Sequence, residues 1–222
     1  MNSSQWIKLA ARAGIIGPFF FGVILTTLTI LKYDFLISLG WHPLLAPTFD
    51  WPSGLALGEY GWIMTATFIL SGLMMTIFAS GLRLSLPPVR PASIGALLLS
   101  LAGLALMGIA FTTDPTLRST PATWHGRLHD LSFVLLGLTL MPAIILLGFA
   151  FRKDEHWDNL SLYTWITVAF AFPAFWLKGA AFYVFMLAVL VWCEVIAFCL
   201  TKLAFKLFAQ AAVLGGEDAS YR

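Results

Sequence analysis

Residues Leu131–Phe151, with the sequence LSFVLLGLTLMPAIILLGFAF, form an unbroken run without a charged side chain. A helix needs about 20 mainly apolar residues to cross roughly 30 Å of hydrocarbon. Five further runs are long enough or nearly so: Ala13–Leu31, Gly61–Leu82, Ala92–Thr113, Leu160–Leu177 and Gly179–Thr201. None alternates as a barrel strand does, so helices, which pair their backbone amides internally, are the structure expected in lipid.

The composition agrees with a membrane protein. The chain is 59% hydrophobic and 11% charged, whereas soluble domains are about one quarter charged. We therefore predict an all-α fold, a six-transmembrane-helix bundle that forms a single integral membrane domain over residues 1–222, with the lipid bilayer as its main partner. The expected helices cover about 13–33, 60–83, 91–113, 121–151, 160–177 and 179–206. The charge pattern contains no basic stripe that would indicate nucleic-acid binding.

Basic residues in the connections predict the orientation, because Lys and Arg are retained on the cytoplasmic side. Nine fall on one side of the six-helix arrangement: Lys8, Arg12, Arg83, Arg90, Arg152, Lys153, Lys202, Lys206 and Arg222. Four fall on the other side: Lys32, Arg118, Arg127 and Lys178. Both termini are therefore expected in the cytoplasm, with the chain in the cytoplasmic membrane of the cell.

Three prolines lie inside the predicted helices, at positions 18, 142 and 173. Each removes a backbone hydrogen bond and is expected to bend its helix. Such bends would open a cavity between helices, although a bundle can also tolerate them without one.

Three motifs follow one another along the chain. They are Arg12-x-Gly14-x-x-Gly17-Pro18, then Leu55-Ala56-Leu57-Gly58-x-x-Gly61-Trp62, then Phe111-x-Thr113-Asp114 followed by His125-x-x-x-His129. In this order and spacing, over about residues 12–206, the chain resembles a bacterial and archaeal membrane family catalogued as domain of unknown function 998. The resemblance implies six helices in one bundle and brings no established reaction.

The two histidines of the third motif are candidate metal ligands. His125 and His129 are four residues apart, so on a helix they share one face about 6 Å apart. Such a pair can bind a divalent metal such as zinc, with Asp114 as the third ligand and water in an open fourth position. Glu59 or Asp130 would then be the base that activates the water, in a metal-dependent hydrolase acting on a lipid or small-molecule substrate.

The same cluster also has a structural explanation. Thr120 and Pro121 fit an N-cap followed by proline at the first helical position, and Asp114 before Pro115 is a common helix end. On this interpretation the outer cluster is a hydrogen-bonded polar pocket that can bind a lipid headgroup. The sequence leaves both interpretations open.

Glu194 is the second candidate site, because it lies near the centre of the sixth run. A carboxylate at that depth costs a few kcal/mol, so it should face the bundle interior and find a partner or a proton. Glu194 would be the proton carrier of a small proton-coupled transporter, or a structural link between two helices. A third hypothesis is a non-catalytic scaffold or regulatory subunit, in which small-residue helix faces also serve oligomers.

Overall fold

The computed structural model describes residues 3–42, 51–114, 122–176 and 180–217, and for residues 175, 176 and 207–217 it describes the backbone only. In chain order the elements are α1 (Ser3–Leu31), α2 (Tyr33–Ser38), η1 (Pro52–Ala56, a 3₁₀ helix), α3 (Gly61–Ser85), α4 (Arg90–Gly108), α5 (Trp124–Phe151), α6 (Asn159–Trp176) and α7 (Ala180–Glu217). These segments contain no strand, which confirms the all-α prediction.

Within the described residues, five helices are long and apolar enough to cross a membrane. They are α1, α3, α4, α5 and residues Ala180–Lys206 of α7. Helix α6 has 18 residues and therefore a length of about 27 Å, slightly less than the hydrocarbon layer. A sixth span through α6 stays a prediction.

Four helix ends differ by three or more residues from the predicted ones, and one of them is the end of α7, at Glu217 instead of residue 206. Helix α1 begins at Ser3 because Ile7, Ala10 and Ala11 are buried, while Arg12 lies on its exposed face. A search for charge-free runs therefore shortens this helix. Helix α4 ends at Gly108 instead of residue 113.

Helix α5 begins at Trp124 instead of residue 121, and its N-cap is Thr123, whose hydroxyl accepts a hydrogen bond from the amide of Gly126. A threonine at the N-cap satisfies an otherwise unpaired amide, which fixes this start. The predicted N-cap Thr120 and its neighbour Pro121 lie outside the described residues.

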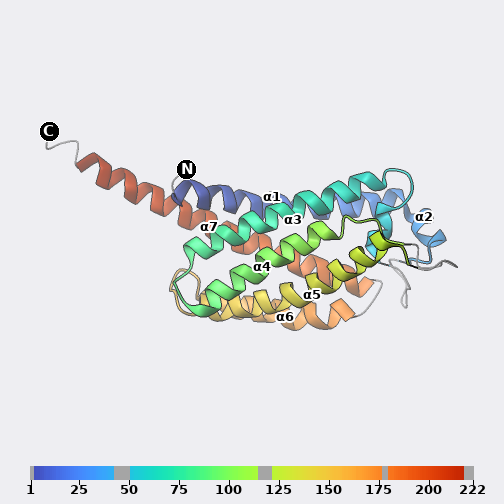
Figure 1. The fold of residues 1–222 in the computed structure, drawn as a ribbon. Coiled ribbons are helices and arrows are strands. Elements are labelled where there is room, and N and C mark those ends of the chain that lie inside the picture. Colours follow the sequence, from blue (N-terminus) through green and yellow to red (C-terminus); the bar gives the residue numbers. More distant parts are fainter. Residues whose placement is uncertain (1–2, 43–50, 115–121, 177–179, 218–222) are drawn as a thin grey trace.

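The long helices form a closed ring in chain order (Figure 1). Helices α1, α3, α4, α5, α6 and α7 each pack against the next, and α7 closes the ring against α1. The beginning of α1, the end of α7 and the connections α3–α4 and α5–α6 lie at one end of the bundle. Helix α2 lies at the opposite end, called the outer end below, where α3 and α5 begin and α4 stops.

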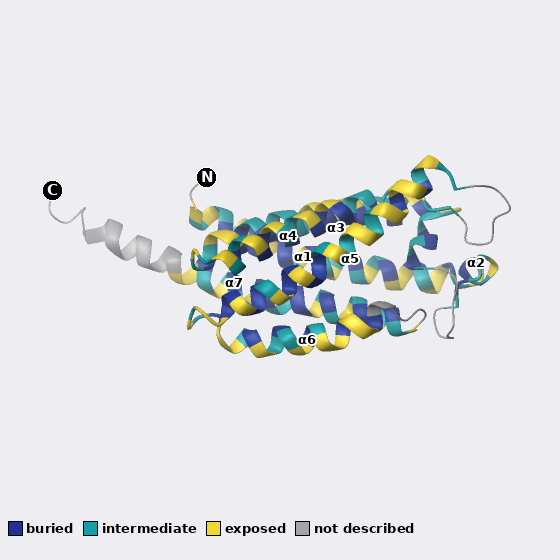
Figure 2. Cartoon of the chain, turned by 60° about the horizontal axis from the view of Figure 1, so that its bottom comes forward, coloured by how far each residue is buried: buried dark blue, intermediate teal, exposed yellow. Residues whose placement is uncertain are grey.

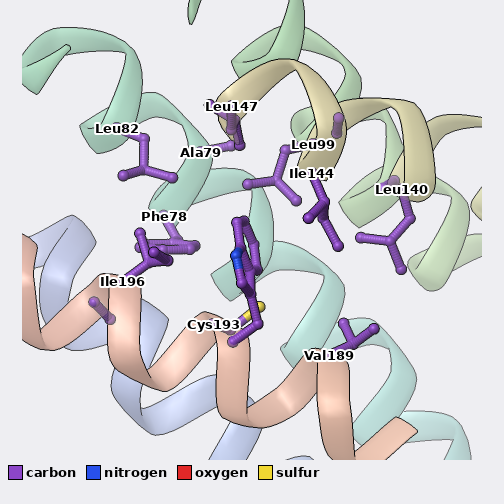
Figure 3. Close-up of a cluster of buried hydrophobic side chains, with 14 of the residues drawn as sticks. Phe78, Ala79, Leu82, Leu99, Leu140, Ile144, Leu147, Val189, Cys193 and Ile196 are labelled. Atoms are coloured by element: carbon purple, nitrogen blue, oxygen red, sulfur yellow. The ribbon is translucent and has the colours of Figure 1, made fainter. Parts of the chain in front are cut away.

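Buried residues line the inside of the ring, and exposed apolar side chains cover its outside (Figure 2). This pattern suits a bundle surrounded by hydrocarbon, where the outer surface has no need to be polar. One cluster of buried side chains joins α3, α4, α5 and α7, as Figure 3 shows for Phe78, Leu99, Ile144 and Val189. A second cluster fills the outer end, around Phe21, Phe68 and the fully buried Trp41.

Glycines allow the closest helix contacts. A methyl group on Gly72 of α3 would overlap the carbonyl oxygen of Gly103 on α4, and one on Gly103 would lie 2.5 Å from the hydroxyl of Thr76. In lipid, burial of apolar side chains provides no net driving force for helix association. Helices associate there mainly through close packing, which small residues allow because the backbones can approach. The pair Gly72 and Gly103 therefore sets the distance between α3 and α4.

We expect Gly72→Ala to destabilise the protein by about 1–3 kcal/mol, because the added methyl group forces the α3 and α4 backbones apart. The control is Gly22→Ala on α1, where the nearest atom, in the Leu190 side chain, lies 3.5 Å away at ordinary contact distance. Alanine favours a helix over glycine, so the control should be neutral or slightly stabilising. Unfolding of both variants in mixed micelles measures the difference, and equal stabilities would contradict this account of the α3–α4 contact.

Candidate functional site

A cavity of about 120 Å³ lies within the ring, between the two clusters of buried side chains. Its wall comes from α1, α3, α5 and α7, with Leu106 and Ile109 from the end of α4. Gly17 and Pro18 of α1 belong to the lining, so one of the three helix prolines does border a cavity. None of the lining residues that the structure describes is Asp, Glu, Lys or Arg.

Trp51, Pro52 and Ser53, where η1 begins, line the cavity at the outer end of the bundle and are called its roof below. The indole of Trp51 packs against Phe133 of α5 and Phe182 of α7, with ring centroids 5.1 and 4.8 Å apart. These aromatic contacts hold the start of η1 over the helix ring, so the roof is part of the packed structure.

A buried lysine fixes the other end of η1. The ammonium group of Lys32 donates hydrogen bonds to the carbonyl oxygens of Leu55 and Leu57, at 3.0 and 2.6 Å, and lies 4.7 Å from the ring centroid of Phe35. Burial lowers the pKa of Lys32, and the charge of Glu59 acts in the opposite direction. The motif around Leu55 thus supplies carbonyl groups to a lysine, a role that its sequence did not indicate.

The next residues form a tight turn into α3. Gly58 and Tyr60 both have left-handed backbone angles, with φ of +66° and +60°, and a side chain on Gly61 would overlap the backbone of Ala56. Glu59 is exposed in this turn. The carboxylate of Glu59 accepts a hydrogen bond from the phenol of Tyr60. This hydrogen bond and the negative charge of Glu59 both raise the pKa of the phenol. The predicted catalytic role of Glu59 remains without a test.

His129 links α5 to the end of α4 and is 4% exposed. Its Nδ1 lies 2.9 Å from the carbonyl oxygen of Ile109 and 2.8 Å from that of Phe111. Both partners can only accept, so Nδ1 carries the hydrogen and donates it. The imidazole therefore satisfies carbonyl groups that the end of α4 leaves unpaired, which is why α4 stops before the predicted residue 113.

Asp114 and Thr123 form a second link beside the first. The backbone amide of Thr123 donates to Oδ2 of Asp114 at 2.9 Å, and the Thr123 hydroxyl donates to Oδ1 at 2.7 Å. A side chain on Gly126 would overlap this carboxylate, so glycine is needed there. The Nδ1 of His125 lies 2.8 Å from the carbonyl oxygen of Thr112 and 3.0 Å from the Thr123 hydroxyl.

The structure therefore brings Asp114 and His125 together around Thr123 and gives His129 separate partners in the residues just after α4. In the segments that the structure describes, no group of three or more His, Cys, Asp and Glu side chains is placed to hold one metal ion. Asp130 is exposed on α5. The ligand set Asp114, His125 and His129, with Glu59 or Asp130 as base, stays a prediction.

The family is shown by a sequence comparison. The profile of the family described as "Protein of unknown function (DUF998)" matches residues 33–201. The chain belongs to this family. No curated protein and no solved structure matches it significantly.

Glu194 of this DUF998 protein lies on α7 and is partly buried. Its carboxyl group interacts with the backbone of Phe19, directly after Pro18 of α1. The neighbouring Cys193 lines the cavity, and Glu194 is absent from the described lining. This contact fits the expected structural link between two helices, and proton transfer by Glu194 stays a prediction.

Sequence reasoning missed Ser71 and Lys32. Ser71 is 5% exposed, borders the cavity, and its hydroxyl has no hydrogen-bond partner within the described part of the chain. A serine in the middle of an apolar helix gives little signal, because its hydroxyl usually bonds the carbonyl four residues earlier. In the sequence, Lys32 is one of several basic residues that follow a predicted membrane helix, and nothing there indicates that it is buried.

We expect Asp114→Ala to destabilise the DUF998 protein by about 1.5–3 kcal/mol, because both hydrogen bonds from Thr123 go to a charged carboxylate. The control is Asp130→Ala, which removes an exposed carboxylate from the neighbouring α5 and should change the stability by less than about 0.5 kcal/mol. Unfolding in mixed micelles measures both variants. An Asp114→Ala protein as stable as the wild type would show that the link between this aspartate and the α5 N-cap contributes little.

Proposed function

We propose that the chain is a multi-pass protein of the cytoplasmic membrane that binds small, largely apolar molecules from the bilayer in its central cavity. The observation that carries this proposal is the cavity itself. Well-packed helix bundles contain few voids larger than a water molecule. A void of about 120 Å³ within a ring of helices therefore stands out as a binding site.

The cavity has a suitable size and chemistry. An apolar cavity of about 150 Å³ in another protein binds benzene and stays dry without it. The lining here is mostly Phe, Leu, Met and other apolar side chains, and its polar groups are His129, Ser53, Ser71 and the indole of Trp51. A ligand pocket typically combines an apolar wall with a few polar groups that orient the ligand.

The orientation of the protein belongs to the same proposal. Lys8, Arg12, Arg83, Arg90 and Arg152 lie on segments at the end of the bundle where α1 begins. The positive-inside rule would place this end in the cytoplasm, with both termini. The cavity roof would then face the extracytoplasmic side, close to the outer leaflet.

Metal-dependent hydrolysis is the second candidate, and one observation favours it. His125 and His129 both direct Nδ1 at backbone carbonyl groups, which is also how metal-bound histidines are oriented by their surroundings. In both rings Nε2 is then the nitrogen that could bind a metal. Both oxygens of Asp114 accept hydrogen bonds from Thr123, so this third ligand would have to share or release them.

We expect Val189→Phe to abolish labelling of the cavity by a phenyl-diazirine photoprobe, because the larger side chain fills the space that the probe would occupy. The control is Val191→Phe, the same change at a 45% exposed, lipid-facing position two residues further along α7. Protein in nanodiscs is irradiated with the probe, and labelled residues are identified by mass spectrometry. Wild type and control should carry label on cavity residues such as Met75 and Met186.

Labelling confined to the outer surface of the bundle would contradict the proposal. Elemental analysis of the same preparations tests the second candidate. A stoichiometric metal that is lost in the variant His125→Ala, His129→Ala would favour the hydrolase, with Asp114 as the expected third ligand.

A further inference from the structure

We infer that the cavity selects uncharged molecules that donate a hydrogen bond, namely alcohols or phenols of about one ring, and that Nε2 of His129 accepts this bond. The inference rests on the proposed binding function and adds the class of ligand.

The hydrogen bonds of His129 determine which of its two ring nitrogens carries the hydrogen. Two carbonyl oxygens, those of Ile109 and Phe111, lie within hydrogen-bond distance of Nδ1. A carbonyl group has no hydrogen to give, so the hydrogen of the neutral ring must be on Nδ1. Nε2 of that ring then has a lone pair and acts only as an acceptor.

The second ring nitrogen of His129, Nε2, is available to a ligand in the cavity. His129 borders the cavity, and its Nδ1 bonds carbonyl groups just after α4, so Nε2 is the ring nitrogen that remains for a ligand. The fully enclosed polar side-chain atoms that lack a partner in the described chain are Nε1 of Trp41, Oγ of Ser71 and Nε1 of Trp157. Nε2 of His129 is not among them, as expected for an atom at the edge of a cavity.

The residues that line the cavity favour a ligand without a charge. The described residues of the lining include no Asp, Glu, Lys or Arg, so these residues offer an ion in the cavity no permanent counter-charge. Burial of an unpaired ion costs far more than burial of a neutral polar group that forms a hydrogen bond. A hydroxyl group is therefore the donor that fits, because an ammonium group would be charged.

The second unpaired group supports the same class. The hydroxyl of Ser71 is buried at the cavity wall and has no hydrogen-bond partner among the residues that the structure describes. An ether or a hydrocarbon would offer no hydrogen to either His129 or Ser71. A hydroxyl group can donate a hydrogen bond to an acceptor such as Nε2 of His129. Its oxygen can also accept a hydrogen bond from a donor such as the Ser71 hydroxyl, so an alcohol or phenol suits this wall.

The test uses two isomers of similar volume as competitors of the photoprobe: 4-methylphenol, which donates a hydrogen bond, and methoxybenzene, which can only accept one. We expect 4-methylphenol to compete roughly threefold to tenfold better, after correction for the measured partition of each compound into the nanodisc lipid. This ratio corresponds to one net hydrogen bond between neutral groups.

The matched variant is His129→Asn. The asparagine amide can still donate to the α4 carbonyl groups in place of Nδ1 and has no group at the position of Nε2. The ratio between the two competitors should fall to about one in this variant. His125→Asn, one helical turn earlier and outside the cavity lining, should keep the wild-type ratio.

A wild-type ratio of one, with both compounds displacing the probe from cavity residues, would overturn the inference and leave the proposed function in place. Displacement by neither compound, with no label in the cavity, would overturn the proposed function. A ratio that persists in His129→Asn would show that another group accepts the hydrogen bond.

Nitrogen NMR of the wild-type protein gives an independent readout, since the chain has four histidines and His129→Asn assigns the signal. The unprotonated Nε2 signal should shift with 4-methylphenol and stay unchanged with methoxybenzene. A His129 ring that carries its hydrogen on Nε2 instead would also overturn the inference.

Discussion

Backbone groups at helix ends are the constraint on which the outer end of this protein depends. The bilayer interior offers no water for an unpaired carbonyl or amide group, so side chains must replace it. His129 pairs the carbonyl groups at the end of α4, Lys32 pairs those of η1, and Thr123 pairs an amide at the start of α5. These three contacts determine where the helices stop and turn, and the cavity lies directly beneath them.

The sequence predicted the fold class and the helix positions well, because hydrocarbon thickness leaves few alternatives for long uncharged runs. It predicted helix ends less well, since those depend on contacts between segments far apart in the chain. Helix α4 stops early because a histidine 20 residues later takes its carbonyl group. Helix α1 starts early because Lys8 and Arg12 belong to a helix whose other face is buried. Neither effect is visible in a local pattern of charge or hydropathy.

The candidate site could be predicted only in part. The spacing of His125 and His129 indicated a shared helix face, and both are on α5. Which partner each ring finds depends on the turn after α4, and the sequence alone does not contain that geometry. The cavity was suggested only through the three helix prolines, of which Pro18 borders it, and its apolar wall cannot be distinguished in the sequence from ordinary packing. Ser71 became informative only through the structure, where its buried hydroxyl has no partner in the described segments.

Closure of the ring by α1 and α7 has a consequence for how the protein assembles. The two helices at this seam lie at opposite ends of the described chain, and both contribute to the cavity wall. During synthesis the other helices can pack pairwise as they enter the membrane, yet the chamber stays open along one side until α7 arrives. Lipid tails would fill the unfinished side in the meantime and must leave when α7 docks. Docking of α7 is therefore an exchange of lipid for protein at the wall of the cavity.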